Sequence, residues 1–504
     1  MLFCKSKFYN DNMLNSKVLK IYLKFCYFIV VILCFIITTS CQINPASGEK
    51  EFTLMSKDEE KSIGKSEHQK IIKQFGGVYQ NEKLNNYVKS LGDFLVSTSE
   101  LSDQEFSFTI LDTHIVNAFA LPGGYIYITR GLLALCKNEA QLAGVLAHEI
   151  GHVTARHSAR RYTRVFSTGV IANIINVLAK NNYGIGNLVG QTANLYLLSY
   201  SREQEFEADK LALRNMSKAG FKVEEMGGFL NSMENFGKLF SEMNLIKSSQ
   251  KSDLLSTHPL SSRRINRVIS ESKKFNIASP ITGRELYLKK IDGINFGDKP
   301  EGGTIFRNHF IHPTLKIGFE FNSEFYFLNK PNFIIGYGPD KSKIILDVDL
   351  DKQKSDDILI YTKKILGRNF PSTYSRSIIN DFEYIDISYK KSKNNNRLAV
   401  IKDGNKYFRL FLIEDQNNPS QITQNSFQKI LRTFKKIDIP NKKVESKKIL
   451  KIINVKEGET KEKISNLQMV QPRFSLRLFE IINGLQGKDI EVGQNLKFIT
   501  GDHY

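Results

Sequence analysis

Cysteine is scarce in this 504-residue sequence, and the few cysteines present argue against a fold built on disulfides. Three of the five, Cys4, Cys26 and Cys34, lie in or before an apolar run near the N-terminus. Only Cys41 and Cys136 follow that run, and two cysteines cannot build a disulfide framework if one of them is modified. We therefore expect no cysteine among the ligands of any metal site.

The sequence also lacks an apolar run long enough to cross a membrane. Phe25 to Ile37 is apolar throughout, but its thirteen residues fall short of the roughly 20 that a spanning helix needs. Lysines precede this run, as in the charged start of a signal peptide. A second apolar stretch, residues 165–200, is interrupted by asparagines and by KNNYGIGN. It predicts two helices around a loop and not a membrane span.

The apolar run ends in TTSC at Cys41, which resembles the cleavage site of a bacterial lipoprotein signal peptide. The resemblance implies that residues 1–40 are removed and that Cys41 is lipidated. Gln42 in the next position resembles outer-membrane sorting, and residues 41–56 then form a tether. The alternative is an uncleaved single-span anchor. Separately, Met13 is a second candidate start, since it begins a more typical signal peptide.

The segment AHEIGHVTARHS, residues 147–158, carries the clearest chemistry. His148 and His152 are four residues apart, so on a helix both imidazoles project from one face. Two neutral imidazoles at that spacing can bind one zinc ion. Glu149 lies between them and can act as general base on a zinc-bound water, for hydrolysis of a peptide carbonyl.

A helix around this segment is predicted by its own start signals. Asn138 is a suitable N-cap, and Gln141 three residues later suits a capping box. No proline follows between Glu139 and Arg160, so we expect the helix to run through this range. On such a helix His157 lies about 140° around the axis from His152, so we expect it on the surface.

A third zinc ligand is expected from SREQEFEADKLAL, which begins at Ser201. Glu205 and Asp209 are four residues apart and share a helix face. Glu205 could bind the metal while Asp209 accepts the free N–H of a ligating histidine. Glu203 and Glu207 fit a solvated acidic face, but spacing alone does not choose between the two pairs.

Four motifs in this order resemble the zinc metallopeptidase family 48, which includes CAAX prenyl proteases and HtpX-type gluzincins. They are NAFALPGGYIYITRGLL, HEIGH, SR–E–E–AD and STHPLSSRRI, and together they resemble its soluble, periplasmic BepA-like branch over roughly residues 50–300. The resemblance implies a mainly helical domain with a small β-sheet and one Zn²⁺ per chain. It also implies Glu205 as the third ligand, with Asp209 and Arg202 supporting the ligands from outside.

The same resemblance gives His258, in the THP motif, a place near the zinc-bound water. There it could donate to the developing oxyanion, or it could swing onto the metal and close the site. The alternative is an ordinary turn residue before Pro259.

A strand and a hairpin are predicted ahead of the zinc-binding segment. Residues 106–110 alternate in polarity as a half-buried strand does, and Pro-Gly-Gly at 122–124 predicts a hairpin turn. The family resemblance implies that the strand edge at Asn117, Ala118 and Phe119 pairs with an extended substrate backbone. An ordinary core hairpin is the alternative, and both interpretations can hold together.

Two further domains are expected after the peptidase domain of residues 57–300. Residues 301–443 follow the linker-like IDGINFGDKPEGG and contain two strand–turn–strand patterns and an amphipathic helix from Ser426. They predict an α+β domain of unknown role, with a distant resemblance to PsbP-like sandwiches. Residues 444–504 resemble a LysM module, a small βααβ glycan-binding fold, with a docking or regulatory domain as the alternative.

Together these features predict an α+β protein that is a zinc-dependent endopeptidase of the bacterial cell envelope. We expect it to be periplasmic, attached to the membrane through its N-terminal lipid, and to hydrolyse misfolded or unassembled proteins. Peptidoglycan is a further candidate partner. Nucleic acid is not, because no such motif accompanies the net charge of +19. The alternative is a chaperone-like or peptidoglycan-binding scaffold with a closed, weakly active zinc site.

The lipoprotein hypothesis makes a prediction about Cys41. Mass spectrometry of the wild-type mature N-terminus should find a diacylglyceryl cysteine at residue 41, because two acyl chains hold a protein stably on a membrane. Cys41→Ser should abolish this modification, whereas Cys136→Ser should leave it intact. A wild-type chain that begins elsewhere, or that retains Phe25 to Ile37, would contradict the hypothesis and indicate a single-span anchor.

Overall fold

The computed structural model describes Tyr27 and residues 41–164, 199–243, 257–297, 302–330, 332–338, 341–350, 357–391, 394–414, 420–437 and 447–501. The predicted signal peptide, apart from Tyr27, lies outside these residues, and so does nearly all of the predicted pair of helices at 165–200. Within the described ranges, no helix combines the length and the apolar character needed to cross a bilayer.

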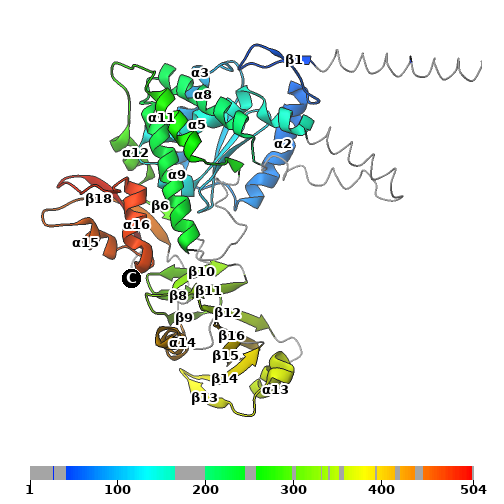
Figure 1. Ribbon diagram of the computed structural model, residues 1–504, viewed down its shortest axis with the longest axis vertical. Helices are drawn as coiled ribbons and strands as arrows, with labels where there is room; N and C mark the ends of the chain where they lie inside the picture. Colours follow the sequence, from blue (N-terminus) through cyan, green and yellow to red (C-terminus); the bar gives the residue numbers. More distant parts are fainter. Residues whose placement is uncertain are drawn as a thin grey trace, which may run out of the picture.

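Helices and strands are mixed throughout, which confirms the α+β class (Figure 1). We call residues 41–297 the N-terminal domain. Its elements are β1 (Cys41–Ile43), β2 (Lys50–Phe52), α2 (Lys57–Gln74), α3 (Glu82–Ser97), β3 (Ser107–Leu111), β4 (Ala118–Leu121), β5 (Tyr125–Thr129), α4 (Arg130–Leu135), α5 (Glu139–Thr154), α8 (Arg202–Lys218), α9 (Glu224–Met243), α11 (Ser262–Ser272), α12 (Arg284–Ile291) and β6 (Ile294–Phe296).

The N-terminal domain contains a three-stranded sheet in the order β3-β5-β4. The predicted hairpin is present, with β4 antiparallel to β5, and β3 runs parallel to β5. The hairpin turn needs glycine, because Gly123 and Gly124 have φ of 81° and 90°. A Cβ at Gly123 would also lie 2.8 Å from Cα of Lys61 in α2. This close approach packs α2 against the turn. Strand β4 lies at an edge of the sheet because only β5 pairs with it in the order β3-β5-β4.

Helix α5 starts where the sequence predicts and ends earlier. Asn138 Oδ1 accepts from the backbone N–H of Gln141 at 2.9 Å, so the N-cap prediction is confirmed. The capping box does not close, because Gln141 Oε1 accepts instead from the backbone N–H of Lys137. The expected continuation to Arg160 is wrong: α5 ends at Thr154, and Arg156 takes a left-handed conformation with φ of 53°. A new helical segment then begins at residue 157.

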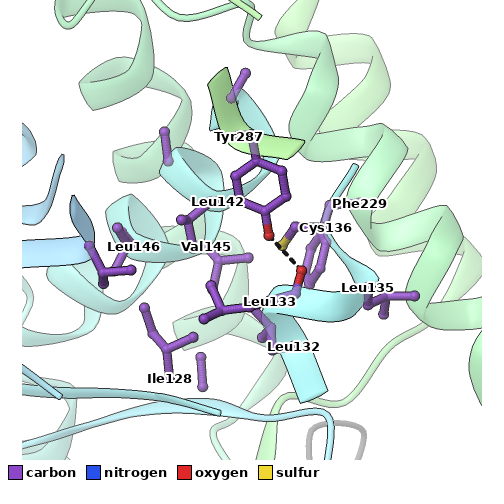
Figure 2. Packing of buried hydrophobic residues seen from close by; sticks show 14 of the residues in the cluster. Ile128, Leu132, Leu133, Leu135, Cys136, Leu142, Val145, Leu146, Phe229 and Tyr287 are labelled. Atoms are coloured by element: carbon purple, nitrogen blue, oxygen red, sulfur yellow. Dashed lines mark hydrogen bonds between the residues drawn. The ribbon is translucent and has the colours of Figure 1, made fainter. Parts of the chain in front are cut away.

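The apolar face of α5 packs into the main core of the molecule (Figure 2). Leu142, Val145 and Leu146 lie there with side chains of β5 and α4. Tyr287 of α12 crosses this core, and its hydroxyl donates to the carbonyl oxygen of Leu133 at 2.5 Å. The start of α5 is therefore fixed by α4 and α12 together.

Residues 302–437 form the middle domain, drawn in the lower part of Figure 1. Its elements are β7 (Thr304–Phe306), β8 (His309–His312), β9 (Ile317–Glu320), β10 (Tyr326–Lys330), β11 (Phe333–Tyr337), β12 (Lys343–Leu350), α13 (Ile358–Leu366), the 3₁₀ helix η4 (Gly367–Asn369), β13 (Ser375–Ile379), β14 (Phe382–Lys391), β15 (Asn394–Asp403), β16 (Lys406–Ile413), α14 (Gln421–Thr433) and β17 (Lys435–Lys436).

The middle domain has two antiparallel sheets. The larger has the order β10-β11-β12-β16-β15-β14-β13, and the smaller has the order β17-β9-β8-β7. The two predicted strand–turn–strand patterns are the pairs β11–β12 and β15–β16. Helix α14 begins at Gln421, before the predicted start at Ser426, because Ser420 accepts from the N–H of Thr423 as N-cap.

Residues 447–501 form the C-terminal module, with β18 (Lys448–Asn454), α15 (Lys461–Asn466), α16 (Pro472–Asn483) and β19 (Asn495–Gly501). This is the expected βααβ order, while its identity as a LysM module stays a prediction. Strand β18 pairs with β19 and also with β6, which lies in the segment expected to be a linker. Leu450 and Ile499 belong to the same buried cluster as α5. The module therefore shares its core with the N-terminal domain.

Lys497 on β19 joins the module to the start of α5. Its side chain is fully buried, and Nζ donates to the carbonyl oxygens of Ala134, at 2.8 Å, and of Cys136. These carbonyls lie at the end of α4, directly before the N-cap of α5. Burial lowers the pKa of Lys497 to about 7.

This buried lysine predicts a pH-dependent stability. Between about pH 7 and 10 the unfolded chain binds more protons than the native one, because an unfolded lysine titrates near 10.4. The free energy of unfolding should therefore rise with pH in this window, by up to ~1.4 kcal/mol per pH unit. Urea unfolding at pH 7, 8 and 9 should show wild type gaining stability relative to Lys497→Met. Parallel pH profiles for the two proteins would contradict the prediction.

Candidate metal centre

Four buried side chains place one ligand atom each within 4.8 Å of one another: His148, His152, Glu205 and His258. Nε2 of His148 lies 3.0 Å from Nε2 of His152 and 3.3 Å from Nδ1 of His258. The two Nε2 atoms lie 3.6 and 3.5 Å from the carboxylate oxygens of Glu205. A tetrahedron around zinc, with bonds of about 2.0–2.1 Å, has edges of about 3.4 Å. The donor set and its spacing therefore fit a zinc ion.

A close helix contact brings these donors together. Helix α5 carries His148 and His152, and α8 carries Glu205. At their crossing a Cβ on Gly151 would lie 3.2 Å from the carbonyl oxygen of Ala208. Glycine in the HEIGH motif therefore lets the backbones approach closely enough for Glu205 to face the histidines. The start of α8 is fixed by a capping box between Ser201 and Gln204.

His148 is oriented by a carboxylate behind it. Asp209 Oδ1 lies 3.0 Å from Nδ1 of His148, which leaves Nε2 facing the cluster. Arg264 of α11 holds Asp209 through two hydrogen bonds of 2.7 Å and also pairs with Glu205. Burial alone would lower the pKa of His148, but its hydrogen bonds to Asp209 and Glu205 raise the pKa to about 9. Without a cation the site thus favours a proton, and a metal must displace it.

His152 is held by a histidine, and the surface position predicted for His157 is wrong. His157 is 0% exposed, and its Nδ1 lies 2.7 Å from Nδ1 of His152. The reason is the left-handed Arg156, which interrupts the helix, so that His157 begins a new helical segment and does not continue the register of α5. The ring of Tyr200 stacks on that of His152, with centroids 3.8 Å apart and an interplanar angle of 17°.

Glu207 also departs from its expected solvated position. Its Oε2 accepts from Nε2 of His157 at 3.1 Å and from Arg160 at 2.8 Å. The hydrogen bond from His157 lowers the pKa of Glu207 to about 2, and that from Arg160 adds to this. Arg160 in turn donates to Glu51 of β2 at 2.7 Å. Glu203, by contrast, is exposed as expected.

Glu149 and His258 face each other beside the ligands. His258 Nε2 lies 3.4 Å from Glu149 Oε1, and both side chains are buried. His258 Nε2 and Glu149 Oε2 have no hydrogen-bond partner among the described residues. Burial raises the pKa of Glu149. A buried carboxylate and imidazole that have free polar atoms and lie beside His148, His152 and Glu205 are suited to handle a proton.

Four of the predicted site residues, Arg202, Asn117, Ala118 and Phe119, lie outside this group. Arg202 is exposed in the first turn of α8, so the supporting role expected for it falls to Arg264. Asn117 precedes the edge strand β4, and its side-chain oxygen accepts from the hydroxyl of Thr257 at 3.4 Å. It thus contacts the residue directly before His258. Ala118 and Phe119 lie in β4 itself and are buried.

Sequence reasoning missed Arg264, Tyr200, His157 and Glu207. Arg264 lies within STHPLSSRRI, the segment already singled out for His258, so the motif itself contained the signal. The roles of His157 and Glu207 depend on the helix break at Arg156. The sequence has no glycine or proline at this break that would predict it.

Comparison with known proteins agrees with this geometry. The family described as Peptidase family M48 matches residues 82–272. The "Beta-barrel assembly-enhancing protease" of Escherichia coli (strain K12) is 29% identical over 215 residues, which are 41% of this chain and 42% of that protein. The "Mitochondrial metalloendopeptidase OMA1" of Schizosaccharomyces pombe (strain 972 / ATCC 24843) is 30% identical over 237 residues, 46% of this chain and 66% of that protein.

Among solved structures, cyanobacterial PsbP from Synechocystis sp. PCC 6803 covers 27% of this chain and 96% of its own. Its 9% identity and TM-score of 0.20 are too low to support an argument.

The matched range contains His148, His152 and Glu205, which the fold brings together as one set of metal donors. The resemblance predicted from the motifs is thereby confirmed, and the chain belongs to the zinc metallopeptidases of family M48.

Proposed function

We propose that the protein is a zinc-dependent endopeptidase that hydrolyses misfolded or unassembled proteins of the bacterial cell envelope. The observation that carries this proposal is the buried set of four donor atoms at tetrahedral spacing, with the carboxylate of Glu149 beside it. The activity of the whole chain is inferred, since it spans only 42% of the Escherichia coli protease that it matches.

His148, His152 and Glu205 would hold the ion, which supplies a polarised carbonyl and a water of lowered pKa. Glu149 then accepts the proton of the attacking water and passes it to the leaving amine. Its raised pKa makes it a stronger base than an exposed carboxylate. His258 can donate a hydrogen bond from Nε2 to the oxyanion, while its Nδ1 remains near the ligand set.

Unfolded segments suit the surroundings of this site. A small pocket beside His148 and Glu149 is lined mainly by apolar side chains of α9, among them Met226, Phe229 and Met233. This lining has the apolar character of the side chains that folded proteins bury and unfolded segments expose. The edge strand β4 could pair with the substrate backbone, as proposed for Asn117, Ala118 and Phe119. All residues of β4 are buried, so strand addition requires a movement that uncovers this edge.

We propose that the protein lies at the periplasmic face of a membrane and is attached there by a lipid on Cys41. The name of the Escherichia coli relative links that protein to β-barrel assembly and supports an envelope role. The C-terminal module is proposed to dock the enzyme, with peptidoglycan as one candidate ligand. Its shared core with the N-terminal domain makes it a fixed part of the enzyme.

A second candidate function is favoured by the position of His258. Its Nδ1 lies 3.3 Å from His148 Nε2 and 3.0 Å from Glu205 Oε1, where a fourth ligand would sit. A metal held by all four residues has no open position for water. The protein would then be a chaperone-like scaffold with a closed, weakly active site.

The ligand set predicts which carboxylate binds the metal. Glu205→Ala should lose zinc, because it removes one of three protein ligands. Glu203→Ala, on the same helix turn but exposed, should keep it. Metal analysis of the purified variants measures this directly. Full zinc occupancy in Glu205→Ala would refute the assignment.

The proposed base predicts a separation of binding from catalysis. Glu149→Gln should keep its zinc and its fold but lose casein hydrolysis by about 10²–10⁴-fold, because an amide cannot accept the proton of the water. A fluorogenic casein assay, with and without a chelator, tests both functions proposed above. Wild type that binds zinc without chelator-sensitive cleavage would favour the scaffold, and an active Glu149→Gln would remove Glu149 as the base.

A further inference from the structure

We propose that His157 and Glu207 are positioning residues that hold His152 in the one tautomer able to bind the metal. The inference rests on the proposed zinc site and concerns the side of His152 that faces away from it. There, two histidines and a glutamate form a chain of hydrogen bonds, with His152 Nδ1 to His157 Nδ1 at 2.7 Å and His157 Nε2 to Glu207 Oε2 at 3.1 Å.

The positions of the protons follow from the ends of this chain. Glu207 also accepts from Arg160, so it is a carboxylate and accepts the N–H of His157 Nε2. A neutral imidazole has one N–H, so Nδ1 of His157 is then an acceptor. His152 must donate to it from its own Nδ1, which leaves a lone pair on His152 Nε2. That atom faces His148 and Glu205 in the metal cluster.

The surroundings of the two rings support this assignment. Tyr200 stacks flat on the ring of His152 and fixes its plane, so the Nδ1 edge points to His157. Gln204 of α8 donates to the backbone carbonyl of His157 at 3.3 Å and holds it in place. His157 has no exposed surface, so water does not compete for the bond between the rings.

The two metal histidines are thus supported in different ways. Nδ1 of His148 lies 3.0 Å from Asp209 Oδ1, whereas His152 reaches Glu207 through the additional ring of His157. Glu207 precedes Asp209 on α8 by two residues, so the two carboxylates point in different directions from the helix. The imidazole of His157 therefore connects His152 to Glu207 through two hydrogen bonds.

The test is the zinc affinity of the purified full chain, measured by competition with a chromophoric chelator. His157→Phe keeps a ring of similar size but offers no acceptor, and it should weaken zinc binding about 10–100-fold, as is usual when such a partner is lost. His157→Gln should restore most of the affinity, because its amide can accept from His152 and donate to Glu207. His68→Phe is the matched control, since His68 also bonds another ring side chain, Tyr127, and should bind zinc normally.

A second pair of variants covers the case in which His157→Phe fails to fold. Glu207→Met removes the acceptor at the partly exposed end of the chain and should weaken zinc binding, while Glu203→Met on the same helix should not. Wild-type affinity in either His157→Phe or Glu207→Met would overturn the inference. So would equal losses in His157→Phe and His157→Gln, since a role in packing alone predicts no rescue by the amide. If wild type itself binds no zinc, the proposed function fails instead.

Discussion

The metal centre depends on the distance between two helices. Because Gly151 has no side chain, α5 and α8 come close enough for three carboxylates and three histidines to share one buried volume. A methyl group at this position would lie 3.2 Å from both the Ala208 carbonyl oxygen and Leu211 Cβ, so the helices would have to separate. The distances from Glu205 on α8 to His148 and His152 on α5 would change with that separation.

Charge is the second constraint on this volume. Glu149, Glu205 and Asp209 are all buried, and burying ionised groups is costly unless they are paired. Arg264 pairs with Glu205 and Asp209, and His258 Nε2 lies 3.4 Å from Glu149 Oε1. A divalent cation would compensate the same negative charges. The buried carboxylates, which are costly without a counter-charge, therefore favour metal binding.

Sequence reasoning found the candidate ligands that the fold brings together, but it failed just beyond the end of α5. It was possible to predict His148, His152 and Glu205 because, on a regular helix, the sequence spacing of two residues fixes whether their side chains share a face. His157 was misplaced because that conversion assumed that α5 continued, whereas Arg156 adopts a left-handed conformation that its residue type does not favour. Long-range contacts were equally hidden: nothing near Lys497 indicates that its ammonium group caps α4, and IDGINFGDKPEGG reads as a linker although β6 within it pairs with β18.

The N-terminal hairpin limits how far the catalytic site could reach. Residues 41–56, expected to be a tether, contain the paired strands β1 and β2, in which Cys41 lies opposite Phe52 and Gln42 opposite Glu51. Glu51 accepts a hydrogen bond from Arg160, and Arg160 also donates to Glu207, which is hydrogen-bonded to His157. A lipid on Cys41 would therefore be separated from the folded domain by about one strand spacing, ~5 Å, and by no flexible chain. If Cys41 carries the proposed lipid, the catalytic site would stay in the layer next to the membrane, and substrates would have to come to that layer.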